Sequence, residues 1–246
     1  MKKKIKVLFV DVGSHECQEI KALTQSSLYL SILYLKRYFL NWFVKGLIAP
    51  PILEFIDFLK IRKKLIKETD FCFVAIEPNW RNLNCKIYKK LNYVFCFGLQ
   101  KIDSDFEIKD LSFKSSNKND QGASLFKTQD HLSLSEAIPV IDTDYFCKNI
   151  LQVILDTYKN GELPKILLRL NCEGTEDDVI YSFQKIFPEI LVGVLGSLDD
   201  VMKKKGTNKA ADLEQYLLLN SIDFCKFSSN MSTWPNALRY LENKLK

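Results

Sequence analysis

Apolar residues gather along this chain into five short runs that are nearly continuous rather than alternating. The runs are Ile5–Val10, Phe71–Ile76, Tyr93–Phe97, Lys165–Leu170 and Ile190–Leu195. Continuous runs of this length are typical of strands that are buried on both faces of a parallel sheet. Segments with helical periodicity separate most of the runs, so the pattern predicts an α/β fold with a doubly wound, mostly parallel sheet.

Residues 24–68 depart from this alternation and predict an inserted helical segment. A first helix has one apolar face, formed by Leu28, Ile32, Leu35, Phe39 and Phe43, before Pro50 and Pro51 break the chain. A second helix places Ile52, Phe55, Ile56, Leu59 and Ile66 inward, and Glu54, Asp57, Lys60, Lys63, Lys64 and Lys67 outward. Lys36, Arg37 and Lys45 interrupt the apolar stretch, so we expect no membrane-spanning helix. Three roles fit this insertion. It packs against the domain or against a second subunit in a homodimer, it covers a bound acceptor substrate as a lid, or it lies on a membrane surface.

Residues 104–128 show a different pattern, in which apolar and polar positions alternate. The apolar positions are Phe106, Ile108, Leu111 and Phe113, and a cluster of Ser, Asn, Asp and Gly follows them. Alternation that ends in turn residues predicts an antiparallel β-hairpin, either added to the sheet or lying over its edge.

Composition is that of one folded domain over residues 1–246, with 47% hydrophobic and 26% charged residues. The net charge of +5 suits an anionic substrate such as a sugar nucleotide, or simply a basic surface. No basic stripe carries interleaved aromatic residues, which argues against a nucleic-acid partner. The seven cysteines are scattered without a C-x-x-C pair, so we expect a reducing cytoplasm, no disulfides and no zinc site. The first apolar run is too short for a signal peptide and predicts a strand.

Chemistry in a parallel sheet concentrates beyond the carboxyl ends of its strands. Residues 11–13, the stretch Asp-Val-Gly, lead from the first strand into a helix, so backbone N–H groups there can bind an anion. Glu77 ends the second strand, where a carboxylate can bind two ribose hydroxyls. Gly98 and Leu99 follow the third strand and offer an apolar surface to an adenine ring.

The fourth strand is followed by Asn171, Cys172 and Glu173. Gly174 has no side chain, so another group can come close to the backbone there. A helix begins next, and Thr175 and Asp178 have the spacing of a capping box, with Glu176 and Asp177 in the first turn. Acidic side chains interact favourably with the positive end of the helix dipole, which explains the acidic residues of that turn. This interaction does not explain Glu173, which precedes the cap and is therefore a candidate for chemistry.

Five motifs in this order resemble those of the FkbM-type S-adenosylmethionine-dependent methyltransferases. The motifs are VDVGSHECQE, VAIEPNW, CFGLQK, NDQGASLF and LLRLNCEGTEDDVI. The family typically shows D-x-G-A-N-x-G-Q, F-E-P-N, an A-L-G-like segment, a G-S-S-L-like segment and K-I-D-V-E-G-A-E. The likeness covers most of the chain outside residues 24–68. It implies a class I methyltransferase fold and O-methylation of a sugar hydroxyl, often in polysaccharide biosynthesis, with S-adenosylhomocysteine as the product.

By motif position, the resemblance places a set of residues around the cofactor. Asp11, Gly13, Ser14, His15 and Gln18 belong to the motif that surrounds the methionine part, Glu77, Pro78 and Asn79 to the ribose motif, and Asn171 to the corner near the methyl group. Three positions depart from the family pattern: Cys17 stands at a usual glycine, His15 at a usual asparagine and Asn171 at a usual aspartate. Glu77 also lies 66 positions after Asp11 instead of about twenty, and the helical insertion accounts for the excess.

Transfer of a methyl group to a sugar hydroxyl benefits from a base within hydrogen-bond reach, and the candidates are Glu173, His15 and His131. The carboxylates near Glu173 would also allow a divalent metal, but no ligand spacing is diagnostic and no metal site is predicted. Two other functions fit the sequence. One is a binding or assembly module that keeps the fold without turnover, and the other is ribose methylation of nucleic acid.

Overall fold

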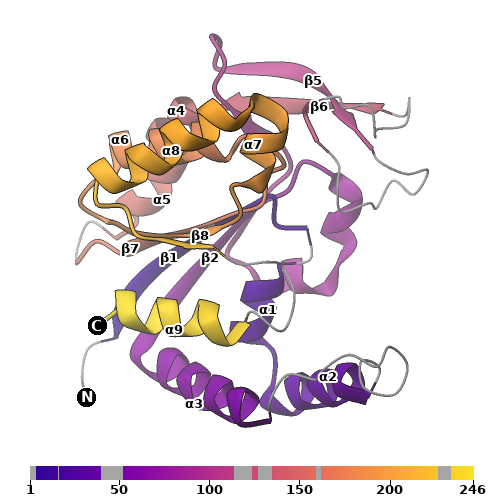
Figure 1. Ribbon diagram of the computed structural model, residues 1–246, viewed down its shortest axis with the longest axis vertical. Coiled ribbons are helices and arrows are strands. Elements are labelled where there is room, and N and C mark those ends of the chain that lie inside the picture. The colour runs from indigo at the N-terminus through magenta and orange to yellow at the C-terminus, as the bar shows by residue number, and fades with distance from the viewer. Residues whose placement is uncertain are drawn as a thin grey trace.

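The computed structural model describes residues 4–15, 17–39, 52–113, 124–126, 135–158, 162–226 and 234–246. A six-stranded sheet with the order β3-β2-β1-β7-β8-β9 lies at its centre, and every neighbouring pair of strands is parallel (Figure 1). The strands are β1 (Ile5–Val12), β2 (Thr69–Ile76), β3 (Tyr93–Phe95), β7 (Lys165–Leu170), β8 (Leu191–Gly196) and β9 (Phe224–Lys226). The predicted α/β fold is confirmed, and the strand order is that of Rossmann-like sheets, with the switch point between β1 and β7.

All five predicted strands are present in this sheet. The third is shorter than predicted because the chain leaves β3 at Phe95 and begins β4 (Gly98–Gln100) in a second sheet. The sequence pattern does not predict β9, since its three residues are only partly buried and form no apolar run.

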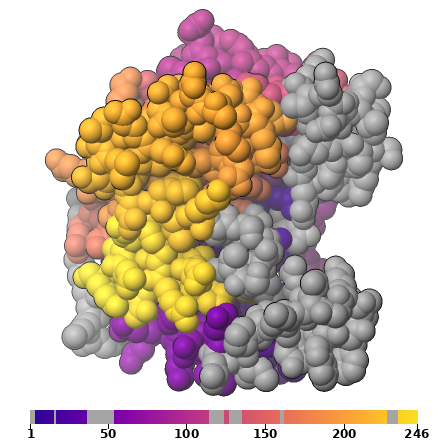
Figure 2. Space-filling view, in the orientation of Figure 1, coloured from indigo at the N-terminus to yellow at the C-terminus, as the bar shows by residue number. Residues whose placement is uncertain are grey.

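Helices cover both faces of the sheet (Figure 1). One face carries α1 (Gln18–Thr24), α2 (Ser27–Phe39), α3 (Ile52–Glu68), α9 (Trp234–Lys244) and the short turns η2 (Trp80–Asn84) and η3 (Lys86–Lys90). The other face carries α4 (Thr143–Tyr145), η4 (Phe146–Leu151), α5 (Gln152–Asp156), α6 (Glu176–Ile186), α7 (Asp199–Lys205) and α8 (Thr207–Leu219). On the side shown in Figure 2, α9 lies between α8 and α3.

The continuous apolar runs follow from this three-layer arrangement. Along β1, Leu8 and Val10 belong to the core on one side of the sheet, whereas Val7 and Phe9 belong to the core on the other side. All four side chains are at most 1% exposed, so both faces of the strand demand apolar residues.

The antiparallel hairpin predicted within residues 104–128 is present at one residue pair, Ser112 and Ser124, which exchange two backbone hydrogen bonds of 2.9 Å. The first strand, β5 (Phe106–Ser112), does exist, but it pairs antiparallel with β6 (Ser135–Asp142), which lies outside the predicted range. Strands β4, β6 and β5 form a separate three-stranded sheet in that order. Periodicity revealed the first strand, but pairing over this distance leaves no local signal.

The helical prediction for residues 24–68 is confirmed in its elements and partly wrong in its faces. In α2 the predicted apolar face is exposed, at 72% for Leu28, 58% for Ile32 and 51% for Leu35, and the opposite side, with Leu30 and Tyr34, is the one buried against the domain. In α3 the buried apolar side chains are Phe58 and Leu65, whereas Ile56 and Ile66 are exposed and Phe55 and Leu59 are half-buried. The acidic and basic residues expected outward on α3 are all exposed. Phe43 and the side chains of Phe39 and Ile52 lie outside the described residues.

An inward-facing arginine fixes the two inserted helices to the domain. Arg62 of α3 is 8% exposed and donates hydrogen bonds to the backbone carbonyls of Ala22, Leu23 and Gln25, which surround the end of α1. It also reaches the Ser27 hydroxyl at the start of α2 over 3.2 Å. None of the described helices is both long enough and apolar enough to cross a membrane.

Candidate functional site

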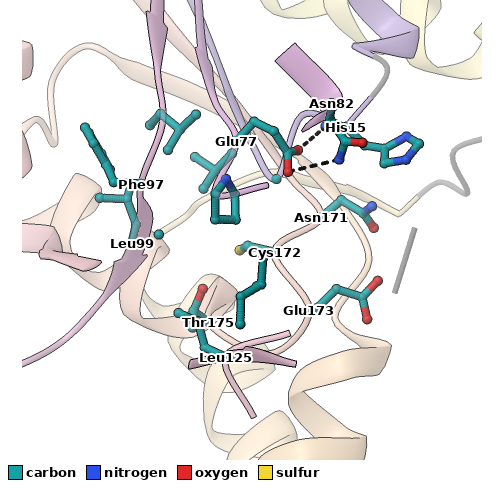
Figure 3. Close-up of a pocket in the computed structure, with 16 residues that line it drawn as sticks. His15, Glu77, Asn82, Phe97, Leu99, Leu125, Asn171, Cys172, Glu173 and Thr175 are labelled. Carbon is teal, nitrogen blue, oxygen red and sulfur yellow. Dashed lines mark hydrogen bonds between the residues drawn. The ribbon is translucent and has the colours of Figure 1, made fainter. Parts of the chain in front are cut away.

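A pocket opens at the carboxyl edge of the parallel sheet, where β1, β2 and β7 end beside β4 (Figure 3). It contains about 570 Å³ of empty space, part of which is open to solvent. Its lining residues are Val12, Gly13, His15, Ile76, Glu77, Pro78, Asn82, Phe97, Gly98, Leu99, Leu111, Leu125, Asn171, Cys172, Glu173 and Thr175.

The pocket has an apolar end and a polar end. Phe97, Leu99 and Leu125 form the apolar end, together with other aliphatic side chains of both sheets (Figure 3). His15, Asn171 and Glu173 lie at the other end and carry their polar groups toward the same side (Figure 3). A flat heteroaromatic ring is suited to the first end and hydrogen-bonding groups to the second.

The loop after β1 has an unusual backbone. Gly13, His15 and Cys17 have φ angles of 69°, 43° and 48°, so alternate residues lie in the left-handed region. A non-glycine residue in this conformation costs about 1–2 kcal/mol. Two of these positions, 15 and 17, are those where the resembled family has asparagine and glycine, residues that adopt this conformation at low cost. His15 and Cys17 therefore adopt a backbone conformation that asparagine or glycine would adopt at lower cost.

Position 13 requires glycine for two reasons, its positive φ angle and the close packing of the neighbouring backbone. A Cβ atom at this position would lie 2.1 Å from the backbone oxygen of Asn171. The loops after β1 and β7 thus touch at the switch point of the sheet. The missing side chain therefore makes room for the neighbouring loop.

Three side chains from other parts of the chain hold the loop after β1. Glu77 Oε2 accepts a hydrogen bond from the His15 backbone N–H over 2.6 Å. The Tyr88 hydroxyl, from η3, donates a hydrogen bond to the His15 carbonyl over 2.6 Å. Nη1 of Arg169, from β7, donates one to the Gly13 carbonyl over 2.9 Å. These contacts offset the cost of the left-handed residues and fix the loop in advance of binding.

Glu77 lines the pocket but is largely engaged with the protein. Its carboxylate accepts hydrogen bonds from the His15 and Asn79 backbone N–H groups and from the Asn82 side chain, at 2.6, 2.9 and 3.2 Å. A carboxylate has about four lone-pair positions, so one remains for a ligand hydroxyl in this conformation. The side chain is 4% exposed, and burial raises the pKa of Glu77 above its usual value. The neighbouring Asn82 amide is a polar group of the pocket that the sequence pattern did not single out.

Asp11 lies beneath the pocket and does not line it. It is completely buried and forms an ion pair with Arg169 over 3.1 Å, and Arg169 Nε lies 3.1 Å from Glu19 of α1. Burial raises the pKa of the Asp11 carboxyl to about 7, although Arg169 acts in the opposite direction. Asp11 thus positions the arginine that holds Gly13, which differs from the direct cofactor contact expected from the sequence.

Other predicted residues also lie outside the pocket lining. The Ser14 hydroxyl is buried and pairs with Tyr88 over 2.9 Å, and Gln18 begins α1. Asn79 caps η2 by accepting a hydrogen bond from the Arg81 backbone N–H. His131 lies outside the described residues.

The loop after β7 is organised by Glu176. Its carboxylate accepts hydrogen bonds from the Cys172 and Gly174 backbone N–H groups over 3.0 and 2.9 Å, and burial raises its pKa to about 7. Between these two residues Glu173 has a φ of 56°, so a second non-glycine residue of the pocket adopts the left-handed conformation. Strained backbone of this kind concentrates at functional sites.

The predicted capping box at the start of α6 does not form. Thr175 makes no side-chain capping hydrogen bond. Asp178 instead accepts a hydrogen bond from the Lys101 backbone N–H over 3.2 Å, and it lies 3.3 Å from Lys205. Asp177 is fully buried and pairs with Lys205 over 2.6 Å. The acids of this turn therefore join α6 to Lys101, which follows β4, and to α7.

Two of the candidate bases lie in the pocket. Nε2 of His15 is buried and has no hydrogen-bond partner within the described part of the chain. Glu173 is half-buried, and its backbone carbonyl accepts a hydrogen bond from Ser124. Within the same described ranges, no group of three His, Cys, Asp or Glu side chains is arranged to bind a metal ion.

Comparisons of this chain with known proteins identify no homologue. No protein-family model matches the sequence, and neither the curated proteins nor the solved structures contain a significant match to the chain.

Proposed function

We propose that this chain is an O-methyltransferase that binds S-adenosylmethionine in the pocket and methylates a carbohydrate hydroxyl. The observation that supports the proposal most strongly is the origin of the lining residues. Each of the five motifs that resemble the FkbM-type family contributes to this one pocket, through Gly13, Glu77, Leu99, Leu125 and Glu173. These residues span 160 positions of the sequence, from Gly13 to Glu173, and the parallel sheet brings most of them to one edge because they follow its strands.

The two ends of the pocket fit the two ends of this cofactor. The apolar end around Phe97 and Leu99 suits an adenine ring, and Glu77 with Asn82 suits one or both ribose hydroxyls. The N–H groups of the loop after β1 and the polar end near Asn171 suit the amino-acid part. The bound sulfonium would supply an activated methyl group, so the protein's main task is to align it with the acceptor oxygen.

Glu173 is the residue that we assign as the base. Methylation of a hydroxyl releases its proton, and Glu173 would accept that proton while the bound cofactor would supply the methyl group. Glu173 lies at the polar end of the pocket, on the side toward which Asn171 and His15 also point (Figure 3). A base in this position contributes about 10²–10⁴-fold to the rate. His15, with its unpartnered Nε2, is the alternative in the described part of the chain.

Calorimetric titration with S-adenosylmethionine and S-adenosylhomocysteine tests the cofactor assignment. We expect saturable binding of both, and Asn82→Ala should weaken it up to about tenfold through the loss of one hydrogen bond. Glu189→Gln, at an exposed position away from the pocket, is the matched control and should bind like the unsubstituted protein. Failure of the folded protein to bind either ligand at millimolar concentration would overturn the proposal.

A screen of free and nucleotide-linked sugars with a labelled methyl donor tests the reaction itself. Incorporation of label that Glu173→Gln abolishes, while cofactor affinity is kept, supports the assigned base. Binding of the cofactor without transfer to any sugar would favour the alternative function, a binding module that lacks turnover.

A further inference from the structure

Helix α2 presents large apolar side chains to solvent. Leu28, Tyr29, Ile32 and Leu35 are 72%, 48%, 58% and 51% exposed. They lie at the i, i+1, i+4 and i+7 positions of one helix and therefore form a continuous stripe. Contiguous exposed apolar surface of this kind marks an interaction site in soluble proteins.

The fold does not need this stripe, because the other side of α2 already anchors the helix. Leu30 and Tyr34 are 0% and 6% exposed, and the ring of Tyr34 stacks on Phe55 of α3 with the ring centroids 4.0 Å apart. Arg62 ties the start of α2 to α3 through Ser27. The helix is thus apolar on both sides, and the described part of the chain buries one of them.

Positive charge is concentrated in the same part of the chain. Helices α2 and α3 together contain seven Lys or Arg and three acidic residues, a net charge of +4, whereas the whole chain has +5. All other residues together therefore carry +1. Exposed lysines at positions 60, 63 and 67 follow Ile56 along the outer side of α3 at helical spacing. Asp57, an acid of α3, lies 3.8 Å from Lys60 and from Arg239.

We infer that α2 and α3 form a docking surface for an anionic lipid bilayer. Apolar side chains of α2 enter the boundary between headgroups and acyl chains, and the lysines of α3 contact the lipid phosphates. A nucleic acid would satisfy the lysines but offers no apolar environment for the stripe. In a symmetric dimer through this surface, the exposed lysines of α3 would face those of the second copy. The inference is independent of the proposed methyl transfer.

Vesicle flotation with the intact protein tests this surface. We expect binding to vesicles of phosphatidylcholine mixed with phosphatidylglycerol, weaker binding to phosphatidylcholine alone, and release at high salt. The double variant Ile32→Gln, Leu35→Gln should lose binding. Replacing lysines 60, 63 and 67 by glutamine should weaken binding roughly fivefold for each lysine at low salt.

Leu218 and Leu219 of α8 provide the matched control, since they are 80% and 76% exposed but lie outside α2 and α3. The double variant Leu218→Gln, Leu219→Gln should bind vesicles like the unsubstituted protein. Thermal unfolding of each variant shows that it is folded. Absence of binding to the anionic vesicles would overturn the inference. So would a dimer in sedimentation equilibrium that Ile32→Gln, Leu35→Gln dissociates, because a second copy would then cover the stripe.

Discussion

The hydroxyl of Tyr88 donates a hydrogen bond to the backbone carbonyl of His15 over 2.6 Å and accepts one from Ser14 at 2.9 Å. One buried phenol thus holds two consecutive residues of the loop after β1. Two neighbouring residues of that loop, Gly13 and Cys17, share the left-handed backbone of His15. Because the loop lines the pocket, the hydroxyl is a positioning group for whatever the pocket binds.

Tyr88→Phe should therefore lower cofactor affinity through an effect on the loop alone. The phenyl ring preserves the packing of Tyr88, which is 6% exposed, while two buried oxygens lose their partner. We expect a loss of about 1–3 kcal/mol in the free energy of unfolding and about tenfold weaker binding of S-adenosylmethionine. Urea unfolding and calorimetry measure the two effects. Tyr145→Phe, at the 36% exposed ring of α4, is the control that should change neither.

Gly13→Ala should be among the most damaging single changes in the chain. The new methyl group would meet the Asn171 carbonyl at 2.1 Å, a backbone atom that cannot move without shifting β7, and it would also occupy a φ of 69°. We expect a loss of more than about 3 kcal/mol in the free energy of unfolding. Gly206→Ala separates the two causes, because Gly206 also has a positive φ but no atom within 4 Å of the added Cβ. Equal losses for the two variants would show that backbone strain alone is responsible.

The sequence predicts the central sheet well because a strand buried on both faces has an unmistakable composition. Prediction from sequence fails where two different structures are compatible with the same local pattern. Helix α2 is apolar on both sides, so periodicity cannot decide whether Leu28 or Leu30 faces the core. Strand β5 has the alternation of a hairpin, but its partner begins 23 positions after Ser112, at Ser135.

Motif order predicts which loops form the pocket, whereas it does not predict what each side chain does there. Asp11 and Ser14 belong by position to a motif that resembles a cofactor loop, yet their partners in the structure are Arg169 and Tyr88. Those partners come from β7 and η3, which no local pattern connects with the loop after β1. The charge of Arg169 inside an otherwise apolar strand is the one sequence signal that could have revealed a buried ion pair.

His15→Asn should stabilise the folded chain. Asparagine adopts the left-handed conformation more readily than histidine, so we expect a gain of about 0.5–1 kcal/mol in the free energy of unfolding, measured by urea titration. Ser221→Asn, at a φ of 52° outside the pocket, should give a similar gain and serves as the control. A loss of stability in His15→Asn alone would mean that the imidazole ring makes contacts worth more than the strain. If methyl transfer persists in this variant, the imidazole is not the base.

The stability of the protein should fall as pH rises from about 5 to about 8. Burial raises the pKa of both Asp11 and Glu176 to about 7 in the folded chain, whereas an exposed carboxyl titrates near 4. Between these values the folded state binds more protons than the unfolded state, so deprotonation favours unfolding, and the loss is complete above the folded pKa. The total effect is on the order of a few kcal/mol.

Urea midpoints measured across that pH range test this prediction. Asp11→Asn removes one of the two titrating groups while Glu19 still neutralises Arg169, so the slope should become shallower but remain. Glu189→Gln, which changes an exposed carboxyl, should leave the slope unaltered. The depressed pKa of Asp144, about 2, affects stability only at lower pH, because its salt bridges to Lys101 and Lys185 persist throughout the window. A midpoint that rises from pH 5 to pH 8 would show that both buried carboxyls are ionised at the lower end, and that the ion pair with Arg169 outweighs burial at Asp11.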